Sequence, residues 1–292
     1  MRLQSTSLSI GAALLVLPLM SPAQPSAHYV PGVEGIKGAS LPPPGIYLRD
    51  YNVAYYSEQL NDSSGNSIGG LNPRAFIYAN VPRVIWITPC QVLGGYLGVD
   101  ALVPLQYTSL RLGGFHDQTF GIGDAFAEGT WSRHWKQLDV SAGYGAWAPT
   151  GSSSSPGHNP TRAGLGYWTH MFTAGATYYP DAAKKWSASA LSRYEINMEH
   201  EGLTVGQAYT LEWGLSRAII PTIDAGLAGY YQQQVTSDNN GSPLNRVAGI
   251  GPEISAFCPK CAVGVSLRYA YEFMAENRLE GHTVALTITK RF

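Results

Sequence analysis

The C-terminal stretch from Gly281 to Phe292 alternates strictly between two kinds of side chain. Successive side chains of a strand point to opposite sides, so this period of two predicts a β-strand with two unlike faces. The apolar face holds Val284, Leu286, Ile288 and Phe292, and the other face holds Thr283, Ala285, Thr287 and Thr289. A strand of this kind predicts a sheet with an apolar medium on one side and small or polar groups on the other.

The rest of the chain after residue 45 repeats this alternation and predicts about twelve strands in all. They cover 46–58, 74–88, 92–107, 119–135, 138–149, 163–179, 185–198, 207–219, 222–235, 244–257, 263–276 and 281–292. Long connections rich in Gly, Ser and Asn, such as 109–117, alternate with short ones, as in outer-membrane barrels. Pro82 and Pro104 indicate irregular positions, and Asp124 breaks the parity of its strand, which indicates a bulge.

Composition separates a barrel in a membrane from a soluble sandwich. Charged residues make up only 13% of the chain, which also has 33 Gly, 18 Tyr and 7 Trp, whereas an ordinary soluble domain has about 25% charged residues. After the N-terminal region, no window approaches the roughly 18 consecutive apolar residues of a membrane-spanning helix. We therefore predict an all-β fold, a transmembrane antiparallel β-barrel of about twelve strands.

The N-terminal region predicts two further segments. Arg2, the apolar run from Leu8 to Met20 and the small residues before position 24 are typical of a signal peptide over 1–23. Residues 24–45 are irregular and contain three consecutive prolines, so they form either a linker or a plug folded into the barrel mouth. The barrel itself would cover 46–292, with both termini on the periplasmic side. Without residues 1–23 the chain has 18 basic and 20 acidic residues, which does not favour a nucleic-acid partner.

Alternation predicts which side chains line the lumen. Twelve strands close into a cylinder of roughly 24 Å, which leaves about 10 Å between inward side chains, enough for a small molecule. The charges could form a stiffening network with Arg193 and Arg268 as its hubs, or they could border a solute path whose acids disfavour anions. The predicted lining is Asp50, Phe76, Tyr78, Trp86, Tyr96, Asp100, Asp139, Trp147, Arg193, Glu195, Glu212, Asp224, Glu253, Arg268 and Glu272.

The sequence shows no motif for chemistry, so we expect no catalytic residues, no metal and no cofactor. The histidines are scattered without metal-ligand spacing, and no Gly-x-Ser-x-Gly elbow, phosphate loop or dinucleotide fingerprint occurs. Cys258 and Cys261 could close a disulfide across a tight turn; the alternative, a redox pair, is expected to open a helix, and strand-like sequence lies on both sides here. Cys90 is left without a partner.

Several stretches together resemble one family of bacterial outer-membrane barrels, named for the meta-pathway of phenol degradation. They are HYVPGVEGIKGASLPPPG (28–45), GIGD (121–124), YWTHMFTAGATYY (167–179), WSASALSRYEIN (186–197), LEWGLS (211–216), GYYQQQVTSD (229–238), GPE (251–253), SLRYAYEF (266–273) and LTITKRF (286–292). The final strand also resembles that of other outer-membrane barrels, which implies that the barrel-assembly machinery reads Phe292. The resemblance implies an outer-membrane location, contact with lipid and lipopolysaccharide, and passive uptake of small hydrophobic or aromatic compounds.

Two other functions stay open at this point. A plugged barrel could serve as a structural or surface-interaction protein without transport. A lipid hydrolase at the membrane rim would need His and Ser on an outer strand face, whereas the predicted outer faces carry Tyr, Trp and aliphatic residues.

Overall fold

The computed structural model describes residues 27–152 and 160–292, and every regular element in them is a β-strand. The predicted signal peptide, 1–23, lies outside the described residues. The strands are β1 (Gly45–Leu60), β2 (Arg74–Val92), β3 (Gly95–Leu102), β4 (Leu105–Leu112), β5 (Phe115–Ile122), β6 (Ala125–His134), β7 (Leu138–Ala148), β8 (Thr169–Tyr178), β9 (Trp186–Asn197), β10 (Ala208–Ile220), β11 (Ile223–Gln234), β12 (Arg246–Cys258), β13 (Val263–Glu276) and β14 (Leu279–Arg291). No helix in this part of the chain is long and apolar enough to cross a membrane.

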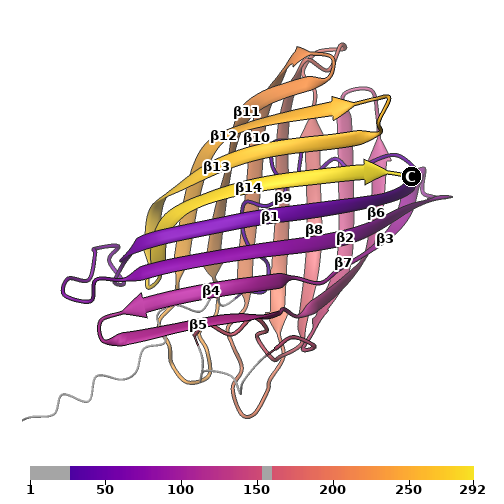
Figure 1. The fold of residues 1–292 in the computed structure, drawn as a ribbon. Coiled ribbons are helices and arrows are strands. Elements are labelled where there is room, and N and C mark those ends of the chain that lie inside the picture. The colour runs from indigo at the N-terminus through magenta and orange to yellow at the C-terminus, as the bar shows by residue number, and fades with distance from the viewer. Residues whose placement is uncertain (1–26, 153–159) are drawn as a thin grey trace, which may run out of the picture.

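The strands form one antiparallel sheet that closes on itself (Figure 1). β1 pairs with β14 on one side and with β2 on the other, so that Tyr51 lies between Thr287 and Val81. The closed ring runs β1, β14, β13, β12, β11, β10, β9, β8, β7, β6, β3, β2 and back to β1. The prediction of a twelve-strand antiparallel barrel is confirmed.

Two crossings of the barrel are interrupted, which accounts for the two extra strands. The chain breaks at Val103-Pro104 between β3 and β4, and at Gly123-Asp124 between β5 and β6. β2 spans both halves: its residues 83–92 pair with β3 and its residues 74–80 pair with β4. Pro104 lies in the first break, as expected for a residue without a backbone N–H. The second irregularity is a break in the strand, whereas the sequence indicated a bulge.

The β4–β5 hairpin is the largest departure from the predicted elements. Residues 109–117 were predicted to form a long loop, but they continue both strands up to a turn at Gly113-Gly114. The hairpin lies at one edge of the barrel wall in Figure 1. Among the described strands, β5 pairs with β4 alone. Local sequence could not show this hairpin, because β4 is held in the wall by pairing with one half of β2 while β3 pairs with the other half.

The two faces of the wall differ in chemistry. Large apolar side chains are exposed on the outside of almost every strand, including Trp86 and Leu267, each about half exposed. Polar side chains such as Thr169, Thr210 and Glu195 are buried on the inside. A water-soluble protein would reverse this arrangement, so the outer face fits lipid and the inner face fits a polar interior.

The end of the barrel near Gly45 and Phe292 is the one that the sequence assigns to the periplasm. Here the backbone N–H of Phe292 donates to the Ile46 carbonyl. The turn between β12 and β13 lies at this end, where Cys258 and Cys261 form a disulfide. Cys90, near the end of β2, is an exposed free thiol.

Candidate functional site

The segment before β1 lies inside the barrel, and we call residues 27–44 the plug. Ala27, Tyr29, Ile36 and Ala39 are all buried in it. The plug has no regular strand or helix, and Gly32 and Gly35 adopt left-handed backbone angles, φ 84° and 81°, that favour glycine. In the structure this segment packs against the inner wall of the barrel.

Carboxylates of the barrel wall hold the plug by its backbone. Glu212 on β10 accepts hydrogen bonds from the N–H groups of Gly32, Val33 and Glu34, at 2.5, 3.1 and 3.2 Å. Glu195 on β9 likewise accepts from two successive plug N–H groups, at 3.0 and 3.1 Å. Such charge-assisted bonds satisfy an irregular backbone that has no sheet partner.

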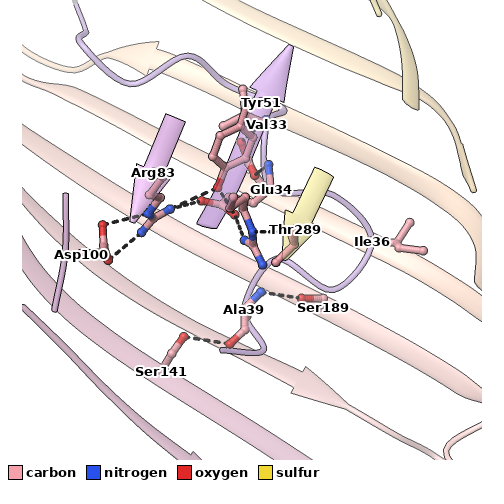
Figure 2. Close-up of polar contacts among 12 residues, drawn as sticks. Val33, Glu34, Ile36, Ala39, Tyr51, Arg83, Asp100, Ser141, Ser189 and Thr289 are labelled. Atoms are coloured by element: carbon pink, nitrogen blue, oxygen red, sulfur yellow. Dashed lines mark hydrogen bonds and ion pairs between the residues drawn. The ribbon is translucent and has the colours of Figure 1, made fainter. Parts of the chain in front are cut away.

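Glu34 of the plug is the centre of the ion-pair network in the lumen (Figure 2). Its carboxylate lies 2.9 Å from Arg83, 3.1 Å from Arg193 and 3.2 Å from Arg49. Burial alone would raise the pKa of Glu34, but these three guanidiniums dominate and lower it to about 2. The carboxylate therefore stays charged at any physiological pH.

The expected hubs, Arg193 and Arg268, are members of this network but not its centre. Arg193 contacts Glu34 and lies 4.0 Å over the Tyr29 ring. Arg268 donates to the Val33 carbonyl at 3.0 Å and lies 3.6 Å from Glu253. Glu34 and the wall residue Arg83 each have three ion-pair partners. Glu34 joins arginines of three strands because the plug fills the space between the walls.

Most other residues of the predicted lining also meet the plug or one another inside the barrel. Asp100 binds Arg83 through two bonds of 2.8 and 2.9 Å, and Asp224 pairs with Lys37 at 2.8 Å. The remaining contacts are Glu253 with the Ile36 N–H, Asp139 with Ser40, Trp147 stacked on His28, Glu272 with Tyr55 and Tyr230, and Tyr96 packed against the cluster of Tyr47, Ile85 and Ile87.

Four residues expected in the lumen face outward instead: Asp50, Phe76, Tyr78 and Trp86. The three aromatic side chains are 39–49% exposed, while Ala75 and Ile85, one residue away, are buried. The assumption that polar residues face inward fails on β1 and β2, because their inner face packs on the plug and on an apolar cavity. Asp50 instead bonds to Asn52 and Asn80, at 2.9 and 2.8 Å, on the outer face.

Alternation in the sequence did not predict Glu34, Arg49 and Arg83 as lumen residues. A usable signal was present for the two arginines: Arg49 shares the parity of Tyr51, and Arg83 shares that of Ile85. A charged side chain in mid-membrane faces the interior, so each arginine identifies the inner face of its strand. Glu34 had no such signal, because its segment has no periodicity.

A cavity of about 270 Å³ lies in the lumen, next to the plug. Tyr29 and Val33 of the plug form part of its floor. The walls come from the inner faces of β1 to β4, β6 to β9, β11, β13 and β14. Most of its surface is apolar, including Ile77, Val81, Leu110, Phe126, Trp147 and Met171. Within the described residues, no group of His, Cys, Asp and Glu side chains could hold a metal ion.

A closed barrel with a lipid-facing exterior, a charged interior and an internal plug defines an outer-membrane β-barrel. The chain belongs to the family whose model is described as "Putative MetA-pathway of phenol degradation", which matches residues 57–288. Family, fold and the apolar outer face together place it in the bacterial outer membrane.

Solved structures share the fold at low sequence identity. The COG4313 outer membrane channel from Pseudomonas putida F1 is 12% identical with a TM-score of 0.76, covering 90% of this chain and 100% of that one. The β domain of the Bordetella autotransporter BrkA is 11% identical with a TM-score of 0.53, covering 85% and 99%. No curated protein matches this chain.

Proposed function

We propose that this chain is a channel for the passive uptake of small hydrophobic or aromatic compounds across the outer membrane, with no catalytic step. The observation that carries the proposal is the apolar cavity of about 270 Å³ inside the barrel. Small-molecule sites are concave and mostly apolar, with a few polar groups. An engineered cavity of about 150 Å³ accepts benzene, so this one is large enough for one or two rings. The family description, which refers to phenol degradation, and the fold shared with the Pseudomonas putida outer membrane channel support the same function.

Passage would require the plug to shift. The plug runs from the cavity floor at Val33 towards the periplasmic end, where Ser40 contacts Asp139 near the start of β7. Water can replace its hydrogen bonds and ion pairs with the wall. The apolar packing of Tyr29 and Val33 would also have to separate. Movement of this segment is therefore the step that would connect the cavity with the periplasm.

The plug also favours a second candidate, a sealed barrel with a structural or surface role. Three wall carboxylates, Glu195, Glu212 and Glu253, bind its backbone, and Glu34 binds three arginines. So many contacts are compatible with a permanent closure. Solute flux distinguishes a permanent closure from a movable one.

The test is uptake of radiolabelled naphthalene by intact Gram-negative cells, whose lipopolysaccharide leaflet slows apolar solutes. Cells with the protein should take it up several-fold faster than cells with an empty vector, whereas uptake of labelled sucrose should not change. Equal naphthalene uptake, with the folded barrel present in the outer membrane, would contradict transport and favour the sealed barrel. Release of fatty acid from phospholipid by the purified protein would instead favour a rim hydrolase.

A further inference from the structure

Arg162 reaches the cavity from the connection between β7 and β8. Its neighbour Thr161 donates a hydrogen bond of 2.5 Å to Asp117, and the Leu165 N–H donates one of 2.6 Å to Asp124. These bonds fix the connection against the inner side of β5 and the β5–β6 break. Arg162 is consequently only 7% exposed and lines the cavity with Ala163 and Leu165.

The Arg162 guanidinium has unused hydrogen-bonding capacity. Its Nε and Nη1 atoms are buried and have no hydrogen-bond partner among the described residues. A buried donor without a partner costs free energy, and the cost is larger when the donor is charged. The site is therefore chemically incomplete, and an acceptor in the cavity would complete it.

The carboxylates that line the cavity are already engaged. Asp124 accepts from His28 at 2.9 Å and from the N–H groups of Gly151, Leu165 and Gly166. Glu272 accepts from Tyr55, Tyr230 and the Gly281 N–H. Glu34 is shared by its three arginines. None of these acids forms an ion pair with Arg162 in the described part of the chain.

A second arginine adds to the positive charge. Arg278, in the turn before β14, also lines the cavity, and its hydrogen bond to Gln232 is a long contact of 3.4 Å. The acids of this cavity are thus already engaged by hydrogen bonds and ion pairs within the protein, while the buried Nε and Nη1 donors of Arg162 are unused among the described residues. This balance is the opposite of the expectation that lumen acids disfavour anions.

We propose that Arg162 binds the carboxylate of an amphipathic solute, so that the cavity takes small acids with an apolar body of one or two rings. The inference rests on the proposed function and specifies its substrate class. The planar guanidinium can donate two parallel bonds to one carboxylate, while Phe126, Trp147 and Met171 lie against the apolar body. An uncharged solute of the same shape would leave the guanidinium unpaired.

The test compares 3-phenylpropanoate with the uncharged 3-phenylpropan-1-ol, by equilibrium dialysis against the full barrel in lipid nanodiscs, with empty nanodiscs as blanks. The wild-type protein should bind the acid about tenfold more tightly than the alcohol, as a charge-assisted hydrogen bond implies. Arg162→Gln should remove this preference and leave the alcohol affinity within about twofold of wild type.

Two further variants complete the design. Arg162→Lys should keep part of the preference, since it retains the charge without the two-pronged geometry. Arg74→Gln, at an exposed ion pair with Glu58, should change neither affinity. If Arg162→Gln binds the acid as tightly as wild type while the alcohol still binds, Arg162 does not bind the carboxylate, and the proposed function stands. If the folded wild type binds neither probe, the proposed function fails too.

Discussion

At the scale of single residues, one carboxylate determines how the lumen is closed. Glu34 lies among Arg49, Arg83 and Arg193, and each of these arginines comes from a different strand. Removing one partner of a buried ion pair is costly because the other charge stays behind without compensation. Without the Glu34 charge, Arg83 would keep Asp100 and Glu128, whereas Arg49 and Arg193 would have no other ion pair among the described residues.

We expect Glu34→Gln to loosen the plug by about 3 kcal/mol, within the range for breaking a buried pair. The thermal unfolding temperature should fall, and single-channel conductance in planar bilayers should rise. Glu58→Gln is the matched control, because its ion pair with Arg74 is exposed and should contribute almost nothing. Wild-type conductance and stability in Glu34→Gln would show that the network does not hold the plug.

The Glu34 carboxylate determines how the stability of the docked plug changes with pH. Its pKa is about 2 with the plug in place and about 4.3 when free. A lowered pKa stabilises the docked plug fully above the free value, and this contribution is lost as the pH falls through about 2. The conductance of the wild-type protein, recorded beside that of Glu34→Gln, should therefore stay constant from neutral pH down to mild acid.

Residue by residue, alternation had a clear limit. The structure buries Glu195, Glu212 and Glu253 inside the barrel, as their alternation predicts; a role in a solute path stays a prediction. The prediction that Phe76 and Trp86 face the lumen is wrong. The inner face of β2 is apolar, so polarity alone assigned the two faces of this strand the wrong way round. Arg162 was not predicted to line the cavity, since it lies in a connection that has no periodicity.

At the scale of elements, the plug and the wall fit closely at one position of β10. A Cβ added to Gly214 would lie 2.7 Å from the carbonyl carbon of Ile36, so the plug backbone passes directly over this glycine. Real side chains do not tolerate such a contact, and one of the two segments would have to move. Alternation indicated the strand, but no local pattern showed that a distant segment crosses it.

Gly214→Ala should therefore displace the plug near Ile36 and destabilise the protein by about 1–3 kcal/mol, as overpacking does. Thermal unfolding in detergent measures this. Gly264→Ala is the matched control, because its added Cβ would meet nothing closer than 3.8 Å, and its effect should stay within about 0.5 kcal/mol. Equal unfolding temperatures for the two variants would argue against tight contact between plug and β10.

At the scale of the whole molecule, the sequence was sufficient for the architecture. Twelve crossings, a closed antiparallel wall and the membrane location all follow from alternation and composition, because a barrel in lipid has one chemistry outside and another inside. The path of the plug and the β4–β5 hairpin did not follow, since each depends on contacts between residues far apart in the chain.

The orientation of the wall can be tested on β13. Leu267→Arg puts a charge on the lipid-facing side, where Leu267 is half exposed, and should cost about 2–4 kcal/mol near the midplane. Ser266→Arg points inward, towards water and polar groups, and should destabilise much less. Unfolding in urea within lipid vesicles would measure both. Similar losses for the two variants would contradict the inside-out arrangement of this strand.

The plug precedes β1 directly, so it remains covalently tethered even if it leaves the lumen. A tether of residues 27–44 could extend roughly 60 Å from the periplasmic rim, more than the depth of the wall, so complete withdrawal is geometrically possible. Return would then be an intramolecular step at high effective concentration, independent of the amount of protein. On the proposed channel function, conducting states should accordingly be short bursts that end when the plug binds again in the lumen.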